Sequence, residues 1–129
     1  MTSHRLLHWL IWIIAAATLV SGVVQMLDPG FVLGIVSAQK TPVTEHFFGI
    51  IGMFMAIFGG MLWHALRNPN SQTVAILWSA LQKFGASAAV AIGVEHHLFS
   101  PLALGIASFD FISGILVISY WAKVRSNGN

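Results

Sequence analysis

The chain has no cysteine and very little charge. Without cysteine it can form no disulfide, no thiolate zinc site, no iron–sulfur cluster and no cysteine nucleophile. Charged residues make up only 8% of its 129 residues, whereas soluble domains carry roughly 25%. Such a chain cannot cover a water-facing surface, so a soluble enzyme, a nucleic-acid binder and a disordered protein are all excluded.

In place of charge the chain has hydrophobic sequence. Hydrophobic residues make up 57% of it, and the mean hydropathy is +0.81. A helix needs about 20 apolar residues to cross a hydrocarbon core about 30 Å thick. Four stretches meet this length, at about residues 6–27, 43–66, 72–95 and 101–122. The sequence therefore predicts an all-α polytopic membrane protein, with residues 1–129 forming one domain, an up-down bundle of four transmembrane helices.

Capping and turn residues mark the ends of these stretches. Thr41-Pro42 and Ser100-Pro101 each place a capping side chain before a proline at the first helical position, and Asn70 or Ser71 is expected to cap the third helix. Residues 31–36 are too apolar for a solvated loop and too short to span, so we expect them at the interface or across the outer mouth of the bundle. The first stretch is longer than the apolar region of a signal peptide, about 7–15 residues, so we expect it to be retained.

Cations gather beside one set of helix ends. Arg5, Arg67, Lys123 and Arg125 flank one side of the predicted bundle, and only Lys40 flanks the other. Because Lys and Arg collect on the cytoplasmic side of membrane proteins, both termini are expected to be cytoplasmic. Interfacial aromatic residues at the same helix ends favour the same orientation, namely Trp9, Trp63, Trp78, Tyr120 and Trp121.

Two ionisable residues lie inside the predicted spans, Lys83 in the third and Asp110 in the fourth. A charge at the centre of a membrane helix costs at least ~2.5–3.5 kcal/mol, so it marks a candidate site. At 1.5 Å per residue, both lie roughly 16 Å from the cytoplasmic edge. We therefore predict a buried Lys83–Asp110 ion pair, which either fixes the register of two helices or forms a polar centre for a ligand headgroup or a proton relay. The polar residues that could extend this centre are Gln82, Ser79, Ser87, Ser113, Thr18, Ser21 and Gln25.

Glutamate and histidine cluster at the opposite, outer helix ends. Glu45 and His46 begin the second span, and Glu95, His96 and His97 end the third. Imidazole and carboxylate suit zinc, copper or non-haem iron, and two histidines on facing helices could bracket a haem. The same residues could instead anchor the helices at the headgroup region, because none shows the HExxH pattern. If a metal binds, these five residues are the predicted ligands.

Small residues recur every four positions in the second and third spans. This spacing lets helix backbones approach closely in lipid, and it predicts tight packing within the chain or, alternatively, an oligomer or partner-subunit interface. The two series are Gly52, Ala56 and Gly60, and Gly85, Ala89 and Gly93.

Over about residues 43–122 the spaced small and polar residues form a pattern, namely Gly49-xx-Gly52, the Arg67-Asn68-Pro69 turn, Lys83 and Asp110. This pattern resembles the DoxX-like group of small four-helix bacterial membrane proteins. The resemblance implies a multi-pass protein of the bacterial inner membrane. One relative's association with thiosulfate–quinone oxidoreduction implies an accessory role beside a membrane redox complex. A more distant similarity is to the sterol-isomerase and sigma-2-receptor group, also four helices with buried acids around a lipid-sized cavity, and no catalytic acid of that group is assigned to a residue of this chain.

These observations favour a non-catalytic membrane protein that binds a lipophilic molecule or serves as an accessory subunit of a membrane complex. Its centre would be the Lys83–Asp110 pair. One alternative is a redox protein or enzyme that uses the outer Glu/His cluster with a metal, haem or quinone. Another is a small proton-coupled transporter, which would need to dimerise to form a path. The expected partners are the lipid bilayer, a lipophilic molecule, and a larger membrane complex or a second copy of the chain.

Overall fold

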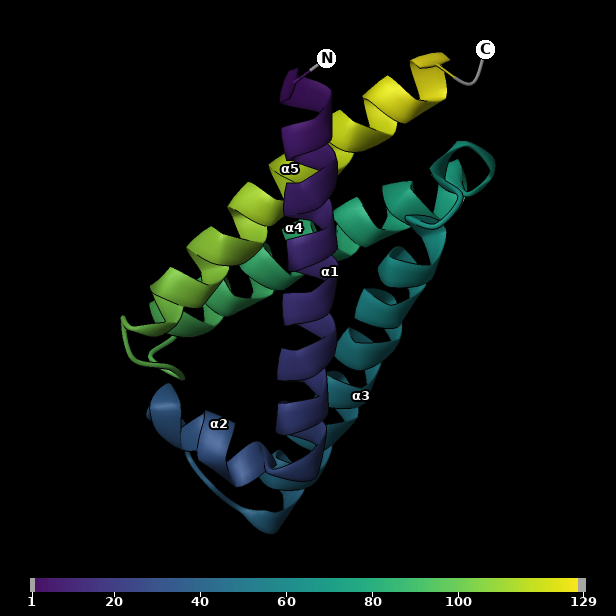
Figure 1. Ribbon diagram of the computed structural model, residues 1–129. Coiled ribbons are helices and arrows are strands. Elements are labelled where there is room, and N and C mark those ends of the chain that lie inside the picture. The colour runs from purple at the N-terminus through teal and green to yellow at the C-terminus, as the bar shows by residue number, and fades with distance from the viewer. Residues whose placement is uncertain (1, 128–129) are drawn as a thin grey trace.

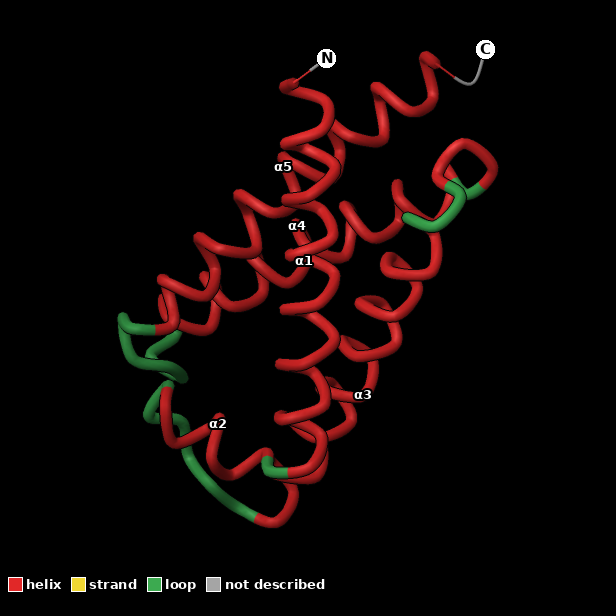
Figure 2. Tube along the Cα trace, viewed as in Figure 1, coloured by secondary structure: helices red, strands yellow, loops and turns green. Residues whose placement is uncertain are grey.

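The computed structural model describes residues 2–127, which are helical apart from short connections (Figures 1 and 2). The elements are α1 (Thr2–Leu27), α2 (Pro29–Ile35), α3 (Pro42–Ala65), the 3-10 turn η1 (Pro69–Ser71), α4 (Thr73–Glu95) and α5 (Ala103–Asn127). Within residues 2–127 there is no strand. Helices α1, α3, α4 and α5 are long and apolar enough to cross a membrane. The prediction of an all-α fold with four long apolar helices is confirmed.

The ends of α3 agree with the sequence-based boundaries within one residue, because its capping residues act as expected. Thr41 Oγ1 accepts a hydrogen bond from the Thr44 backbone N–H at 3.1 Å, and Thr44 Oγ1 accepts one from the Thr41 N–H at 2.7 Å. This reciprocal pair satisfies two donors that the first helical turn would leave open. Helices α1 and α5 extend beyond the predicted spans, because a helix can continue into polar residues that a count of apolar residues leaves out.

The predicted caps of the third and fourth spans were wrong. Asn70 and Ser71 lie in η1, and Gln72 takes the N-cap position of α4 without a side-chain capping bond. The Ser71 hydroxyl donates to the Asn68 carbonyl at 3.1 Å, so it stabilises the turn and is not free to cap the helix. Helix α5 begins at Ala103, two residues after the Ser100-Pro101 pair, which forms part of a turn.

The four long helices are arranged as two pairs. Helix α1 packs mainly against α3, and α4 packs mainly against α5. Successive long helices run in opposite directions, so the start of α1 and the end of α5 lie at one end of the molecule, called here the terminal end (Figure 1). The two pairs cross near this end and diverge toward the opposite end, where α2 lies, called here the α2 end (Figures 1 and 2).

The hydrophobic core lies where the two pairs cross. All four long helices contribute to it, with Leu7, Ile11, Ile14, Ala15, Leu62, Ala65, Leu66, Ile76, Ala80, Val117, Tyr120 and Val124. Tyr120 is only 1% exposed, so its side chain packs into the core and does not face outward as a residue of an aromatic belt would. Its ring fills the core because the α5 face that carries it points at α1, whereas the side chains of Trp9, Trp63 and Trp78 are exposed.

Close backbone contact between α1 and α3 depends on small residues. A Cβ atom at Gly52 would lie 2.6 Å from the Met26 backbone nitrogen, and one at Gly59 would lie 2.8 Å from Leu19 Cα. At Gly60 such an atom would meet nothing within 4 Å. The predicted contact series on this helix is therefore wrong at Gly60, because the 3.6-residue period of the helix turns residue 59 toward α1 and residue 60 away.

On α4 the predicted small-residue series does not mark a packed face along its whole length. A Cβ atom at Gly85 would meet nothing within 4 Å, whereas one at Gly93 would meet the ring of Phe99, in the loop that follows α4. The contact at Gly93 thus lies within the α4–α5 connection, and the surroundings of Gly85 are open. This glycine spacing on α4 does not report helix–helix packing inside the chain.

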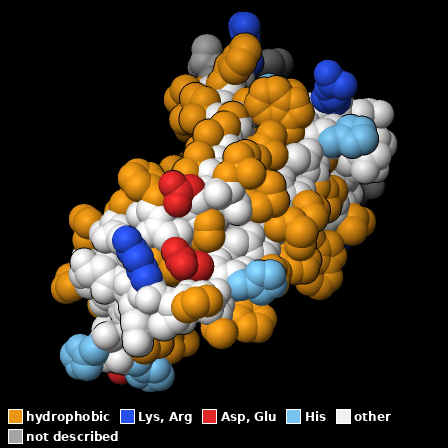
Figure 3. All heavy atoms as spheres, turned by 90° about the horizontal axis from the view of Figure 1, so that it is seen from below, with side chains coloured by type: hydrophobic (Ala, Val, Ile, Leu, Met, Phe, Trp, Pro, Cys, Tyr) orange, Lys and Arg blue, Asp and Glu red, His pale blue; other side chains and the backbone are white. Residues whose placement is uncertain are grey.

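The apolar segment after α1 forms the short helix α2. Asp28 caps it by accepting a hydrogen bond from the Phe31 N–H at 3.3 Å. Just beyond its end, the Val36 carbonyl accepts a hydrogen bond from the Ser100 N–H at 2.9 Å. This bond joins the two helix pairs at the α2 end. Seen from this end, hydrophobic side chains cover the flanks of the molecule, and charged and histidine side chains lie among the backbone and the remaining side chains on the end itself (Figure 3).

Candidate functional site

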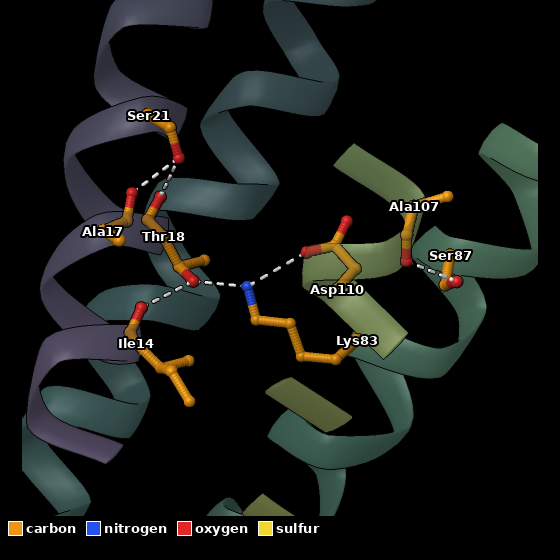
Figure 4. A network of polar contacts seen from close by, with 8 residues as sticks. All are labelled: Ile14, Ala17, Thr18, Ser21, Lys83, Ser87, Ala107 and Asp110. Atoms are coloured by element: carbon orange, nitrogen blue, oxygen red, sulfur yellow. Dashed lines mark hydrogen bonds and ion pairs between the residues drawn. The ribbon is translucent and has the colours of Figure 1, made fainter. Parts of the chain in front are cut away.

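The charged residues inside the bundle lie together. Lys83 extends from α4, and its Nζ lies 3.6 Å from Asp110 Oδ1 on α5 (Figure 4). The Lys83 side chain is 4% exposed and that of Asp110 is 15% exposed. An ammonium and a carboxylate at this distance offset part of each other's desolvation cost.

Lys83 also reaches the other helix pair. Its ammonium donates a hydrogen bond to Thr18 Oγ1 on α1, and that hydroxyl donates in turn to the Ile14 carbonyl at 2.8 Å (Figure 4). The Lys83 Nζ lies 5.9 Å from the centre of the Phe109 ring, within the range of a cation–π interaction. One side chain of α4 therefore connects α1 with α5 at the level where the two pairs begin to diverge.

The Asp110 carboxylate is only partly used by Lys83. One of its oxygens faces the ammonium, and the other points away from it (Figure 4). A carboxylate can accept hydrogen bonds at both oxygens. The second oxygen is thus the atom of this centre that is best placed to meet a group from outside the chain.

Seven other polar residues were expected to extend the centre. Within the described part of the chain, only Thr18 among them forms a hydrogen bond with the Lys83–Asp110 pair. Ser87 donates to the Ala107 carbonyl at 2.8 Å and so joins α4 to α5 away from Lys83 (Figure 4). Gln25 donates to the Phe48 carbonyl at 3.0 Å and links α1 to α3. Ser79 and Ser21 bond to carbonyls one turn earlier in their own helices, Ser113 is buried, and Gln82 is half-buried.

The five predicted metal ligands do not form one ligand set in the structure. Glu45 and His46 border a shallow groove of about 450 Å³ between α1, α2 and α3. Glu95, His96 and His97 are exposed at the end of α4. Within the described residues, no three His, Asp or Glu side chains lie close enough together to hold a metal ion. The physical reason is that α3 and α4 belong to different pairs, which diverge at this end.

A second polar cluster was missed by the sequence analysis. The Trp12 indole N–H donates to His8 Nε2 at 2.9 Å, and His8 Nδ1 lies 2.6 Å from the Tyr120 hydroxyl. The spacing of His8 and Trp12, four residues apart on one helix, could have indicated their contact. The third member could not be found in this way, because Tyr120 is 112 residues further along the chain.

The fold and this centre define the class of molecule: an all-helical bundle with four helices able to cross a membrane and a charged pair among them. Comparison of the chain with family models, curated proteins and solved structures found no match. The resemblance to the DoxX-like group thus stays a prediction. The function has to be argued from the geometry of the charged centre and the surface around it.

Proposed function

We propose that this protein is a non-catalytic, multi-pass protein of the bacterial inner membrane, with α1, α3, α4 and α5 as its spans and both termini in the cytoplasm. It binds a lipophilic molecule at the Lys83–Asp110 centre, or presents that centre to a partner subunit of a membrane complex, such as a redox complex.

The distribution of charge supports this orientation. Four of the six Lys and Arg residues flank the terminal end, namely Arg5, Arg67, Lys123 and Arg125. Lys40 is the cation that flanks the α2 end, which also carries three of the four side-chain carboxylates. An excess of Lys and Arg in short connections marks the cytoplasmic side.

The observation that carries the proposal is the half-used carboxylate of Asp110. Charges inside a membrane bundle are costly and are usually functional. Lys83 is almost fully buried, and its two oxygen partners offset the cost of burying its charge. Asp110 remains 15% exposed, with one oxygen turned away from the lysine. A hydroxyl or N–H group on an otherwise apolar molecule, or on a neighbouring helix, would donate a hydrogen bond to that second oxygen.

The surface around the centre is suited to an apolar partner. Large hydrophobic side chains on α5 are exposed on either side of Asp110, among them Phe109, Phe111 and Ile112. In a bilayer such side chains contact acyl chains, a bound lipophile or another transmembrane helix with equal ease. Polar attachment at Asp110 combined with apolar contact around it is the recognition mode expected for a lipophilic ligand with one polar group.

The test is to extract the protein from its own membrane in styrene–maleic acid discs and record native mass and absorption spectra. We expect a lipophilic molecule or a partner chain to stay with the wild-type protein and to be lost from Asp110→Asn. The matched control is Glu95→Gln, which neutralises an exposed carboxylate at the end of α4 and should retain it. Circular dichroism establishes that both variants keep their helices.

Four results would contradict the proposal. A wild-type protein that is a single chain without ligand has no partner at this centre, and retention that is equal in Asp110→Asn places the partner elsewhere. A Soret band lost on replacing His46 or His96 would favour the redox alternative. Proton flux in liposomes that disappears in Asp110→Asn would favour transport.

A further inference from the structure

A pocket at the terminal end is separate from the charged centre. It has a volume of about 370 Å³ and lies between the start of α1, η1 and the end of α5. Its polar lining comes from His4, Arg5, His8, Asn70 and Tyr120, and its apolar lining from Trp9, Pro69 and Val124. Three segments far apart in the sequence therefore bring nitrogen and oxygen donors to one place.

The hydrogen bonds of the pocket wall determine which atoms carry protons. An indole N–H can only donate, so the Trp12 contact requires a lone pair on His8 Nε2. The proton of a neutral imidazole must then be on Nδ1, which donates to the Tyr120 oxygen. The Tyr120 O–H hydrogen consequently has no acceptor among the described residues. Tyr120 is only 1% exposed, so a buried hydroxyl on the pocket wall has a hydrogen bond left to donate.

The charge around the pocket has one sign. Arg5 lines it, and none of its lining residues is acidic. Arg67, Lys123 and Arg125 lie at the same end of the bundle. The nearest side-chain carboxylate along the helices is Asp110, more than two turns of α5 before Tyr120. An anion entering this pocket meets a positive field and a buried donor together.

We propose that this pocket binds the phosphate of an anionic phospholipid headgroup. The Arg5 guanidinium and the Tyr120 hydroxyl are its donors, since guanidinium–phosphate hydrogen bonds are strong and directional. The exposed Trp9 side chain beside the pocket provides an interfacial ring for the lipid's glycerol and upper acyl region. A cationic pocket at the cytoplasmic end of a bundle is a recognised way to hold anionic lipid. This inference requires the membrane setting but not a ligand at Lys83–Asp110.

The experiment uses the full chain in detergent, with native mass spectrometry to measure binding of phosphatidylglycerol and of phosphatidylcholine. We expect a clear preference for phosphatidylglycerol. Arg5→Gln should weaken its binding at least about tenfold and Tyr120→Phe about fivefold, since each removes one donor to a charged oxygen. Arg67→Gln is the matched control, because it removes an equal charge from the same end but outside the pocket, and it should change binding less than twofold.

Several outcomes would overturn the inference. Equal binding of the two lipids would mean that the pocket does not recognise an anionic headgroup. Equal losses in Arg5→Gln and Arg67→Gln would leave only unspecific attraction between charges. Displacement of phosphatidylglycerol by inorganic phosphate at equal concentration would assign the pocket to a free anion. A quinone retained by the wild type, lost in Tyr120→Phe and kept in Arg5→Gln would assign it to a neutral acceptor.

Two comparisons keep the result independent of folding and of the proposed function. Arg5 is exposed, so Arg5→Gln should leave the fold intact. If Tyr120→Phe unfolds at a lower temperature than the wild type, the inference is tested by Arg5→Gln alone. Asp110→Asn should leave phosphatidylglycerol binding unchanged, because Asp110 does not line the pocket. Loss of headgroup binding in Asp110→Asn would show that the two sites are one.

Discussion

Removing one partner of the Lys83–Asp110 pair should destabilise the protein much more than removing both. Asp110→Leu leaves the ammonium of Lys83, whose side chain is 4% exposed, with the Thr18 oxygen as its remaining partner. Lys83→Met leaves the carboxylate of Asp110, whose side chain is 15% exposed and therefore better solvated than that of Lys83. Lys83→Met with Asp110→Leu leaves no charge and fills the same space with apolar groups.

The magnitudes follow from these exposures. Breaking a buried pair by removing one partner costs about 3–5 kcal/mol. The loss has an upper bound, because the stranded group can change its protonation, which for a lysine or an aspartate at pH 7 costs about 4–5 kcal/mol. We expect about 4 kcal/mol for Asp110→Leu, about 2–3 kcal/mol for Lys83→Met, and a double variant within about 1 kcal/mol of the wild type.

The assay is unfolding in mixed micelles with an increasing fraction of SDS, followed by circular dichroism. Lys123→Met is the control, since it removes an exposed cation at the terminal end and should shift the free energy of unfolding by less than about 0.5 kcal/mol. The reasoning is refuted if both single variants behave like this control, or if the loss in the double variant equals the sum of the single losses.

Other predictions concern the packing of α3 and the link to α1. Gly59→Ala should lose about 1–3 kcal/mol, because its Cβ would lie 2.8 Å from Leu19 Cα, whereas Gly60→Ala, with nothing within 4 Å, should gain up to about 1 kcal/mol; equal effects in an unfolding assay would contradict the α1–α3 contact. Thr41→Ala removes the cap of α3 and should cost about 1 kcal/mol, visible in the same assay, while unchanged stability would mean that the cap is replaced by solvent. Thr18→Val leaves Lys83 without its second oxygen and should cost about 1–2 kcal/mol, but nothing when Lys83 is already methionine.

Much of the fold could be predicted because the relevant signals are local. A long apolar run is enough to define each of the four long helices, and Thr41-Pro42 defines the start of α3 from two neighbouring residues. The prediction of helix ends failed where a competing local structure formed, as in η1, where the Ser71 hydroxyl donates a hydrogen bond within the turn. Lys83 and Asp110 could be singled out because charge is so rare in these helices, and counting residues placed both at the same depth.

The rest of the site depends on how the helices are rotated and where they cross. Counting residues along the sequence gives the depth of a residue but neither of these. Thr18 contacts Lys83 only because α1 crosses the α4–α5 pair at that level, while Ser21, one turn further along α1, bonds to its own helix. The outer glutamates and histidines share a predicted depth, yet the two pairs diverge at the α2 end, so the start of α3 lies apart from the end of α4 (Figure 1). Tyr120 was expected at the interface because its type and position are typical of that place; its burial depends on which way α5 faces.

The pairing of α1 with α3 and of α4 with α5 has a consequence for how the protein is made. Each pair is formed by consecutive long helices, so the first can close once α3 has emerged from the ribosome, before α4 and α5 have both emerged. The second pair can then dock as a preformed hairpin, with Lys83 already beside Asp110 when it meets Thr18 of α1. Two polypeptides, one ending and the other beginning at the α3–α4 turn, should therefore assemble into the same bundle when they are produced together.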